Sequence, residues 1–506
     1  MTSPYQMEKV KNLVLEIKTE INKLEQACTL ANNSDFPVRQ TAFRALKTNL
    51  LTRFLYYFSQ TDPQLVIDIL TEFQETLFTS ICSLLQLEKT KMTEAQRLQM
   101  SLPTSMGGFG VPNLVQQAYL ARLGGIIRSF DYTKTGVIRH TAPDDRPLHV
   151  EFNSVKEKIL SFFGENIPQE IAQRFSELTN IIETFRQAPP MVDQKHFTRF
   201  QQTVTQALAE DAQKQWIDKV KAGIDESDQY TMRRLDSIKS SETGIPLNVP
   251  TKYNSNQLGD SLFLMYAKRR LLYDFNQESH CAHCGGTMDK LGEHAFRCKK
   301  IGKVPQHNEV RDAIYGVCAG LVKRTKKNNH VVRKETCIKQ YRRDGKGSVK
   351  DVEKTRADVE IKQTMPYHKS TLIDVTLRYI KPGRSQGRAA AKGEEEKLGN
   401  YHKLYKFPHN VEFVPFGMDT FGDWGPAARD WIQKVCRAFS EDQDPKVMSE
   451  MYNRAITNAR IAITMALVRG TTGRIRKMLE GEEVYYDRTE VVDVDGQLWE
   501  GDFRNI

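Results

Sequence analysis

The segment that decides the organisation of this chain runs from His280 to Thr376 and opens with HCAHCGGTMDKLGEHAFRC (280–298). It closes with RADVEI (356–361) and TLIDVTL (371–377), each of which carries one aspartate. The first part has the cysteine and histidine spacing of a zinc site. The alternation and β-branched content of the other two predict β-strands. We therefore expect a small metal-stabilised module directly before a domain that contains a sheet.

Four residues of the first part follow the spacing Cys-x2-Cys-x9-His-x3-Cys. Thiolate and imidazole groups at four positions suit a closed tetrahedral zinc site, which keeps no open position and is therefore structural. The alternatives are two unrelated pairs of buried residues, or replacement of one ligand by the flanking His280 or His283. The predicted zinc ligands are Cys281, Cys284, His294 and Cys298.

The two strand aspartates, Asp358 and Asp374, can hold a divalent cation between adjacent strands. Mg²⁺ binds through one or two carboxylates together with substrate phosphate and water, and such an ion supports phosphodiester hydrolysis. A single aspartate at a strand end is more often a plain surface residue. The prediction therefore depends on the combination with Glu335 upstream and with a following helix that presents Lys397 and, one turn later, Tyr401.

The charge of the chain favours a polyanionic partner. The 506 residues carry a net charge of +10, and an excess of this sign is typical of nucleic-acid binding. Between residues 321 and 350, eleven Lys or Arg stand against only Glu335 and Asp344. This is the footprint of phosphate-backbone binding, although a solvated loop has the same composition. We expect DNA, or RNA, as the partner of Arg333, Lys334, Arg342 and Arg343.

The remaining cysteines and the apolar stretches bound the compartment. The start of the chain, MTSPYQMEKV, is polar and does not predict a signal peptide. No stretch approaches the roughly 18 apolar residues of a membrane span, so we expect no membrane partner. Five cysteines are scattered singly and are predicted to be buried thiols in a reducing compartment, nucleus or cytoplasm. These are Cys28, Cys82, Cys318, Cys337 and Cys436.

The first half of the chain predicts helices. Helical spacing of Leu13, Ile17 and Ile21 gives one helix, and Asp62-Pro63 marks the start of another. The glycines and prolines of SLPTSMGGFGVPNL (101–114) interrupt the pattern, and helix resumes with LVQQAYLARLGG. Residues 131–256 read as a helical connector without motifs. Within and just beyond it, GIPLNVPTKYNSNQ (244–257) is the clearest candidate for a linker.

The second half predicts an α/β core. A helix over 307–322 follows the cysteine motif, and a third strand, VEFVPFGMD (411–419), follows the Lys397 helix. The apolar helix 451–470 completes the order strand, strand, helix, strand, helix, which suits an α/β domain.

Two passages resemble non-LTR retrotransposon reverse transcriptases. LPTSMGGFGVPNL with AYLARLGG, and TNLLTRFLYYFSQTDPQ before them, are similar to the region that closes the thumb in that family. The family's polymerase aspartates lie upstream, in a Tyr/Phe-x-Asp-Asp hairpin and a separate strand, and this sequence has neither. Its Asp144-Asp145 pair lies in a proline-flanked loop. The resemblance therefore implies the trailing part of such an enzyme, without a polymerase active site.

The acidic strands resemble the PD-(D/E)xK restriction-like nucleases, and more closely the endonuclease at the C-terminus of site-specific non-LTR retrotransposons. There, a CCHC knuckle precedes an Arg-Pro-Asp strand, an Asp-Val strand and a helix with Lys and Tyr. The resemblance implies a DNA endonuclease with structural zinc and catalytic Mg²⁺. By motif position it assigns catalysis to Glu335, Asp358, Asp374 and Lys397, with Asp358 and Asp374 as Mg²⁺ ligands, and DNA contacts to Arg356 and Tyr401.

This sequence departs from the family pattern at two positions. Ala357 stands where the motif has proline, and Thr376 where it commonly has lysine, so proton and charge handling would fall to Lys397. The second reading is a nucleic-acid-binding remnant or domesticated protein that no longer cuts. A third is a zinc-stabilised scaffold that binds protein. A separate reverse transcriptase component is a further candidate partner.

Together these observations predict a multidomain chain with an all-α N-terminal half, a small zinc knuckle and an α/β nuclease-like C-terminal domain. The expected divisions are a thumb-like region 1–130, a helical connector 131–256, a zinc knuckle 257–303 and an endonuclease domain 304–506.

Overall fold

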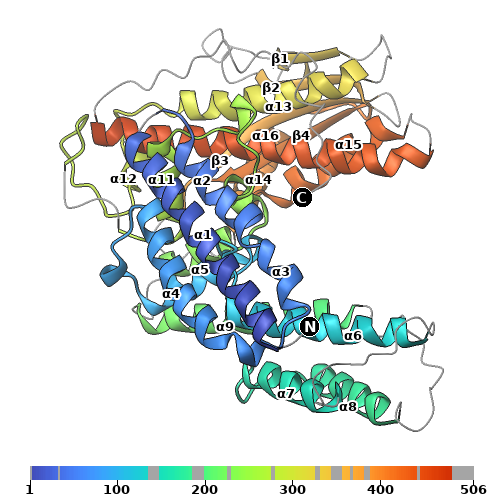
Figure 1. Ribbon diagram of the computed structural model, residues 1–506. Coiled ribbons are helices and arrows are strands. Elements are labelled where there is room, and N and C mark those ends of the chain that lie inside the picture. The colour runs from blue at the N-terminus through green and yellow to red at the C-terminus, as the bar shows by residue number, and fades with distance from the viewer. Residues whose placement is uncertain are drawn as a thin grey trace. The chain divides into compact units, whose positions relative to one another are not determined.

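A computed structural model describes eleven stretches of the chain (Figure 1). They are residues 3–31, 35–134, 148–184, 199–224, 229–274, 280–324, 331–343, 356–364, 369–380, 388–441 and 445–480. Asp144 and Asp145 lie outside them. The chain divides into two compact units. The first comprises Met1–Asn32, Thr41–Pro103 and Gly108–Gly223, and the second comprises Asn33–Gln40, Thr104–Gly107 and Ile224–Ile506.

Within its described residues the first unit contains helices joined by loops and no strand, as the sequence predicts. Leu13, Ile17 and Ile21 form the buried face of its first helix. Ile126, Phe152 and other apolar residues of the later helices form a core cluster of their own. Its principal helices are α1 (Ser3–Ala31), α3 (Arg53–Phe58), α4 (Ile67–Leu84), α5 (Glu94–Ser101), α6 (Leu114–Lys134), α7 (Leu148–Ser161), α8 (Gln169–Thr184) and α9 (Phe200–Ala222), and α2 (Val38–Ala45) begins in residues of the second unit.

Two helix boundaries show how local chemistry sets them. Asp62 caps a turn as predicted, with its carboxylate accepting from Gln64 N at 3.0 Å, but this turn is a short 3₁₀ segment and α4 begins only at Ile67. The predicted break before α6 is confirmed. Gly107 and Gly110 have φ of 96° and 70°, values that residues with a side chain rarely adopt.

The second unit contains a four-stranded mixed sheet in the order β1-β2-β3-β4. The strands are β1 (Val331–Cys337), β2 (Arg356–Thr364), β3 (Lys369–Arg378) and β4 (Val411–Asp419). The pairs β1–β2 and β2–β3 are antiparallel, and β4 pairs with β3 in parallel. Because parallel neighbours need a crossover, α14 (Ala389–Leu404) connects β3 to β4. The predicted strands 356–361, 371–377 and 411–419 are confirmed.

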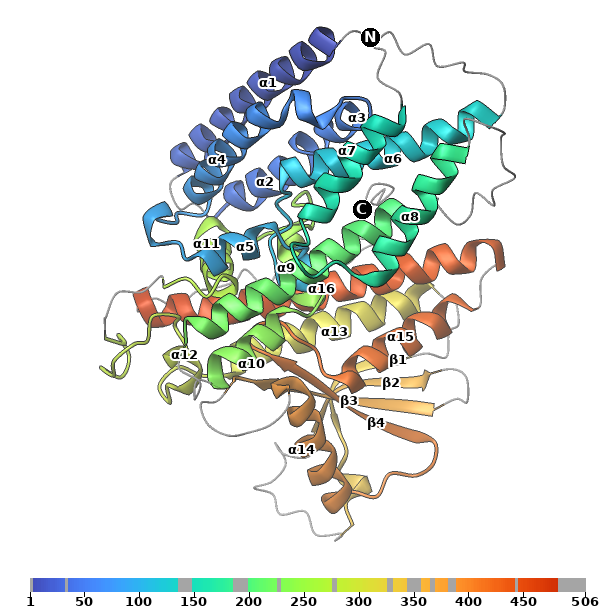
Figure 2. The ribbon, with the colours of Figure 1, turned by 90° about the horizontal axis from the view of Figure 1, so that it is seen from below.

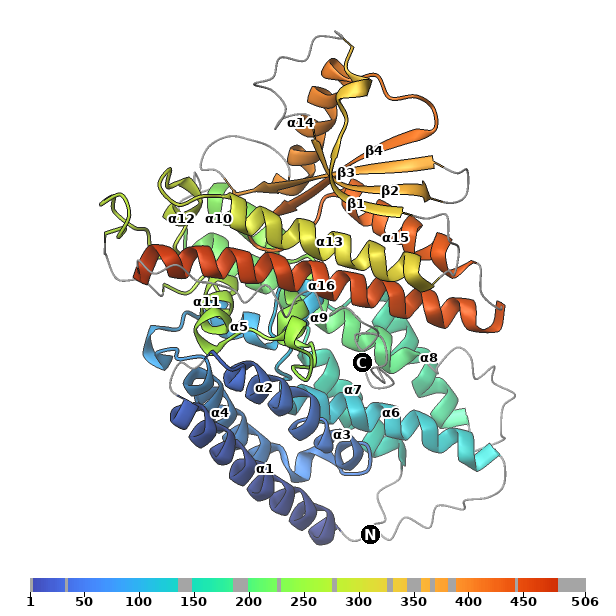
Figure 3. The ribbon, with the colours of Figure 1, turned by 90° about the horizontal axis from the view of Figure 1, so that it is seen from above.

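Helices cover both faces of this sheet (Figures 2 and 3). One face packs Val359, Ile373 and Phe416 against apolar residues of three helices. The other face carries α14, whose Tyr401 packs with Leu372. The three helices on the first face are α13 (Val304–Arg324), α15 (Pro426–Ser440) and α16 (Pro445–Glu480). The sequence did not predict β1 or α15.

The segment 244–257 is not a linker. Leu247 and Val249 are buried, and the segment forms two 3₁₀ turns, Glu242–Leu247 and Asn254–Asn256. Gln40 holds it from a distant part of the same unit, because its side-chain amide donates to the carbonyls of Pro246 and Asn256. The prolines and asparagines that suggested an extended linker instead make tight turns inside the unit. The helices α10 (Gln229–Ile238) and α11 (Asp260–Arg270) flank this segment in the chain.

Two other expectations have an outcome. Among the helices that the structure describes, none combines the length and the apolar composition that a membrane span requires. Four of the five scattered cysteines are buried, as predicted, but the thiol of Cys337 is exposed, because its strand β1 lies at the edge of the sheet.

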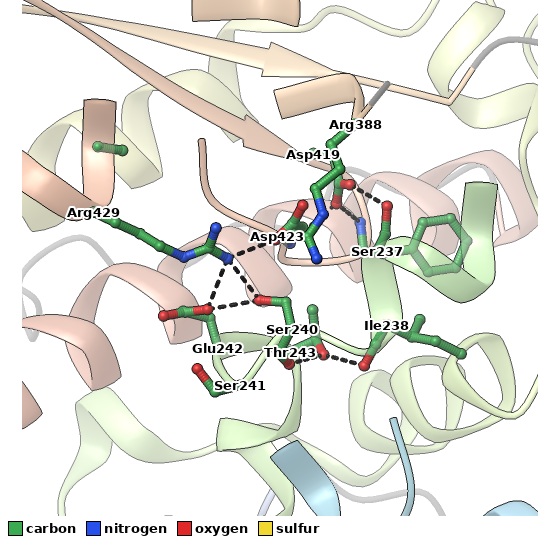
Figure 4. A network of polar contacts seen from close by, with 12 residues as sticks. Ser237, Ile238, Ser240, Ser241, Glu242, Thr243, Arg388, Asp419, Asp423 and Arg429 are labelled. Carbon is green, nitrogen blue, oxygen red and sulfur yellow. Dashed lines mark hydrogen bonds and ion pairs between the residues drawn. The ribbon is translucent and has the colours of Figure 1, made fainter. Parts of the chain in front are cut away.

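A network of buried charges supports the turn after β4 (Figure 4). Arg429 donates to Asp423 Oδ1 at 2.6 Å and to Glu242 Oε2 at 3.0 Å. Burial raises the pKa of Glu242, but the charge of Arg429 and hydrogen bonds from Ser240 and Arg429 outweigh it and lower the pKa to about 2. Burial raises the pKa of Asp419 to about 7, and repulsion from Asp423 adds to the increase. The turn therefore contains a carboxylate, Asp419, whose burial is poorly compensated.

Replacing Asp419 with asparagine is expected to make stability less dependent on pH. Since the pKa of Asp419 rises from 3.8 to about 7 on folding, its contribution to stability is lost as pH increases through that window. Asparagine cannot ionise, yet it keeps an oxygen for the N–H groups of Phe421 and Asp423 and an N–H for Ser237. As pH rises from 5 to 8, the free energy of unfolding of the variant should increase by about 1–2 kcal/mol relative to that of wild type.

Thermal melts at both pH values measure this gain as several degrees. Asp430→Asn is the matched control, because Asp430 is exposed on α15 and pairs only with Lys434 within the described chain. Parallel melting curves for Asp419→Asn and wild type across this pH range would contradict the prediction.

Candidate active site and candidate metal centre

Asp358 and Asp374 lie opposite each other on neighbouring antiparallel strands. The pair Val359–Ile373 sets the register of β2 and β3, and one step further along this register Asp358 faces Asp374. Opposed residues of such strands point to the same face, with Cβ atoms about 4.5–5.5 Å apart. The two carboxyl groups lie within hydrogen-bond reach of each other. The fold thus brings together the two predicted carboxylates.

The two carboxyl groups have different electrostatic surroundings. Burial raises the pKa of Asp374 to about 6 against the opposing charge of Lys397, and the neighbouring Asp358 raises it further. Burial also acts to raise the pKa of Asp358, but a hydrogen bond and charge from His307, with the N–H of Val375, keep it below its usual value. Two carboxylates held this close repel each other, so a cation between them would be stabilised.

Helix α14 supplies Lys397 and Tyr401, the predicted partners of the acidic pair. Lys397 Nζ donates to Asp374 Oδ2 at 2.6 Å. The Tyr401 hydroxyl is within hydrogen-bond reach of the same carboxylate, and burial followed by the charge of Asp374 raises its pKa. Tyr401 stacks on Phe413 of β4, with ring centroids 4.0 Å apart. A lysine and a phenol from one helix therefore converge on Asp374.

Glu394, one turn before Lys397, fixes α14 against β4 and α15. Its carboxylate accepts from the N–H groups of Gly417, Ala427 and Ala428 at 3.1, 2.9 and 2.9 Å. The close approach of Glu394 explains why β4 has a glycine at position 417, since a Cβ there would lie 2.5 Å from Glu394 Cγ. Glu394 could not be predicted from the sequence, because only the fold shows which backbone groups it reaches. Glu394 holds the helix that presents Lys397.

Helix α13 supplies two further residues, His307 and Arg311, that the sequence does not predict as part of the site. His307 Nε2 lies 2.9 Å from Asp358 Oδ1, and the N–H of Val375 donates to Asp358 Oδ2 at 2.6 Å. One turn later, Arg311 pairs with Glu335. The only signal in the sequence is that His307 and Arg311 are four residues apart and therefore lie on one face of the predicted helix. This spacing does not reveal which strand residues they contact.

Glu335 and Arg356 lie beside the acidic pair on the β1–β2 hairpin. Glu335 falls between the pairs Lys334–Val359 and Thr336–Ala357, so it stands across from Asp358. Its φ of 51° is unusual for a strand residue. Arg356 pairs with Glu335 at 3.2 Å. Glu335 is therefore engaged by arginines, while the cluster around Asp374 holds Lys397 and Tyr401.

The predicted phosphate-binding residues lie at two places in the second unit. Arg333 and Lys334 are exposed on the edge strand β1, and Lys334 Nζ pairs with Asp312 at 3.3 Å. Arg343 joins the C-terminal end of α14, where its backbone N–H donates to Leu404 O at 3.0 Å. Arg342 forms an isolated bridge with Tyr405.

The four predicted zinc ligands converge. Their ligand atoms all lie within 4.8 Å of one another, with Cys281 Sγ 3.9 Å from Cys298 Sγ and Cys284 Sγ 3.1 Å from His294 Nε2. Zinc–sulfur bonds of about 2.3 Å in a tetrahedron require ligand separations of this order. The four residues can therefore hold one metal ion, and three cysteines with one histidine suit zinc.

The turn and the small helix that carry these ligands are built for close approach. Gly286 N donates to Cys284 Sγ at 3.4 Å, and a Cβ on Gly286 would lie 3.1 Å from His294 Cε1. Asp289 accepts from the N–H groups of Glu293 and His294 at 2.8 and 2.7 Å, which caps the helix α12 (His294–Arg297). The cluster is closed by residues of one short segment.

The metal-binding segment packs against the C-terminal end of α16. Cys281, Cys298 and Phe296 share a core cluster with Ile475 and Met478. His283, which could have replaced a ligand, instead contacts the carbonyl of Lys477, with Nε2 3.0 Å from the oxygen, and His280 is exposed. The metal centre therefore supports a helix of the sheet-containing unit.

Within the described residues, the Cys281–Cys298 cluster is the one group of three or more potential ligands that converges on a single point. Among the described residues, no third potential ligand converges with Asp358 and Asp374. The acidic pair therefore offers two protein carboxylates to a cation. This fits Mg²⁺, which commonly binds through one or two carboxylates and takes its other ligands from water and substrate phosphate. No known family model matches the sequence, and no curated protein matches it.

Proposed function

We propose that the chain is a Mg²⁺-dependent DNA endonuclease of the PD-(D/E)xK restriction-like type, derived from a non-LTR retrotransposon. The observation that supports this most is the acidic pair. Asp358 and Asp374 lie across adjacent strands, and Lys397 donates to Asp374 at 2.6 Å. A cation, a basic group and a phosphate are the components that phosphodiester hydrolysis needs.

In this proposal each residue of the cluster has its own role. Asp358 and Asp374 would hold Mg²⁺, and a bound ion would supply positive charge for the phosphate and an activated water for attack. Lys397, which donates to Asp374 at 2.6 Å, would stabilise the negative charge that develops on the phosphate. His307 keeps Asp358 oriented through their 2.9 Å contact. Tyr401 positions the carboxylate of Asp374 through its hydroxyl group.

The surrounding residues fit a nucleic-acid substrate. Arg356 and the exposed Arg333 lie on the same hairpin as Asp358, where they would contact backbone phosphates. Zinc at the Cys281–Cys298 cluster would be structural, because all four of its ligands are protein groups. We further propose that the protein acts in the nucleus, where its DNA target lies, alongside a separate reverse transcriptase component.

The test is nicking of supercoiled plasmid DNA by the purified chain in Mg²⁺, with EDTA as the metal-free control. Wild type and Asp358→Ala are compared from parallel preparations, which controls for contaminating nuclease. Cleavage by wild type alone supports the proposal. If both proteins cut alike, or neither cuts in Mg²⁺ or Mn²⁺, the chain is not an endonuclease that uses this site.

The second candidate is a nucleic-acid-binding protein that does not cut. One observation favours it. Both oxygens of Asp358 and one oxygen of Asp374 already have protein partners, His307, Val375 and Lys397, as in a purely structural ion-pair network. This candidate predicts duplex binding whose log affinity falls linearly with log salt concentration, without cleavage in any divalent metal.

A further inference from the structure

We propose that a cavity at the N-terminal end of α14 binds a backbone phosphate of the nucleic acid, away from the acidic pair. The proposal rests on the proposed function for its substrate, and it adds a second anchoring point for the same strand. The cavity has a volume of about 250 Å³, equal to roughly eight water molecules at ~30 Å³ each, so it has room for a phosphodiester group and its water.

Cations from three elements outnumber the acidic groups in the lining of the cavity. Its charged lining residues are Arg233 and Asp236 of α10, Arg378 of β3, and Arg388, Lys392 and Glu396 of α14 or its N-cap. The lining thus carries four positive and two negative groups. Both negative groups are compensated, because Asp236 pairs with Lys239 at 2.7 Å and Glu396 pairs with Arg378. The cavity therefore favours an anion.

Lys392 is the cation best placed to contact a ligand. Its side chain is exposed and forms no ion pair within the part of the chain that the structure describes. It lies in the first turn of α14, whose N-cap residue Arg388 makes no side-chain capping bond. The backbone N–H groups of a helix start carry partial positive charge, and they add to the charge of Lys392.

Two features hold the cationic wall in shape. Arg388 reaches from the cavity towards buried Asp423, with 3.6 Å between Nη1 and Oδ1, at the edge of the charge network (Figure 4). Gly393 lets Arg378 lie across the helix, because a Cβ there would be 2.8 Å from Arg378 Cγ. A glycine inside a helix costs about 1 kcal/mol relative to alanine, and here it makes room for a guanidinium group.

The position of the cavity fits a strand that also reaches the acidic pair. Arg378 follows Asp374 by four residues on β3 and therefore points to the same face, about 13 Å further along the strand. This distance equals roughly four nucleotide steps of 3.4 Å. Lys392 and Lys397 likewise share α14. One nucleic-acid strand can therefore contact both places.

The experiment measures binding of a fluorescently labelled duplex in EDTA by anisotropy, across a series of salt concentrations. Lys392→Ala and Lys392→Glu are compared with Lys434→Ala, which removes an exposed lysine of α15. Loss of one phosphate contact should reduce the slope of log affinity against log salt by about 1. We expect Lys392→Ala to weaken binding about 3–10-fold near 0.1 M salt, and Lys392→Glu to weaken it further. All variants should melt like wild type.

Equal slopes and affinities for the Lys392 variants and Lys434→Ala would overturn the proposal. Two competitors identify the ligand on wild type. If inorganic phosphate or a polyglutamate peptide binds in a Lys392-dependent manner while duplex binding does not depend on Lys392, the cavity is not a nucleic-acid subsite. Because binding is measured without metal, this result is independent of cleavage. A reduced slope together with equal cutting by Asp358→Ala and wild type would refute the nuclease and keep the subsite.

Discussion

Replacing either Asp358 or Asp374 with asparagine is expected to lower the rate of Mg²⁺-dependent DNA cleavage by at least about 10²–10³-fold, the cost of removing one preorganised electrostatic partner. Asparagine keeps the shape of the side chain but loses the charge that a cation requires. Since the two carboxylates act on one ion, the effects of the two substitutions should not add. The double variant should cleave almost as fast as the slower of the two single variants. Single-turnover cleavage with excess enzyme measures the chemical step directly.

The loss of activity should not come from loss of fold. Burial raises the pKa of Asp374 to about 6, so its charged form destabilises the folded state at neutral pH. Neutral asparagine at position 374 therefore should not lower the melting temperature. Duplex binding in EDTA should stay equal or tighten slightly, because a negative charge is removed near the phosphate. Asp430→Asn on exposed α15 is the matched control and should cut like wild type. Near-normal cleavage by Asp374→Asn would show that Asp374 takes no part in the reaction.

Much of the sheet could be predicted from the sequence because its central strands are apolar. Val359 and Ile373 are fully buried, and their segments show strand character without any knowledge of their neighbours. Edge strand β1 was missed because five of its seven residues are exposed and it lies in a run of basic charge. Helix α15 was missed because Gly425-Pro426 signals a turn as strongly as it signals a helix start.

The candidate site could be predicted in part. Asp358 and Asp374 were assigned to a shared site because each lies on a recognisable strand, and Lys397 because it lies on a recognisable helix. His307 and Glu394 could not be found, since a histidine or glutamate on a helix gives no signal of a partner 51 or 23 residues away. The segment 244–257 was misread for a related reason. Composition shows its turns but cannot show that Gln40 binds them.

The metal centre and the sheet are connected through α16, which links the two halves of the predicted function. Ile463 and Leu467 of α16 belong to the core that covers the sheet, while Ile475 and Met478 belong to the cluster around Cys281. One helix therefore contacts the sheet that carries the acidic pair and the segment that carries the four candidate zinc ligands. Loss of the metal should therefore destabilise the C-terminal part of this helix.

Removing the metal is accordingly expected to have the largest effect on stability. Purified protein should contain about one zinc per chain, and Cys281→Ala combined with Cys298→Ala should contain none. Structural zinc sites contribute about 10–16 kcal/mol in isolated peptides, an amount comparable to the whole stability of a domain. We expect residues 280–301 to unfold locally without the metal. This would limit the loss to about 3–5 kcal/mol, or roughly 6–20 °C in melting temperature at 2–4 °C per kcal/mol.

Metal analysis, thermal melts and hydrogen exchange together test this prediction. Exchange should increase over residues 280–301 and over the last turns of α16, because Ile475 and Met478 lose their buried partners. Wild type treated with a chelator should show the same changes and recover when zinc is added back. Cys337→Ala is the matched control, since this exposed cysteine lies on β1, away from the cluster. One zinc per chain in the double cysteine variant, or unchanged exchange in α16 after chelation, would show that these residues are not a structural zinc site.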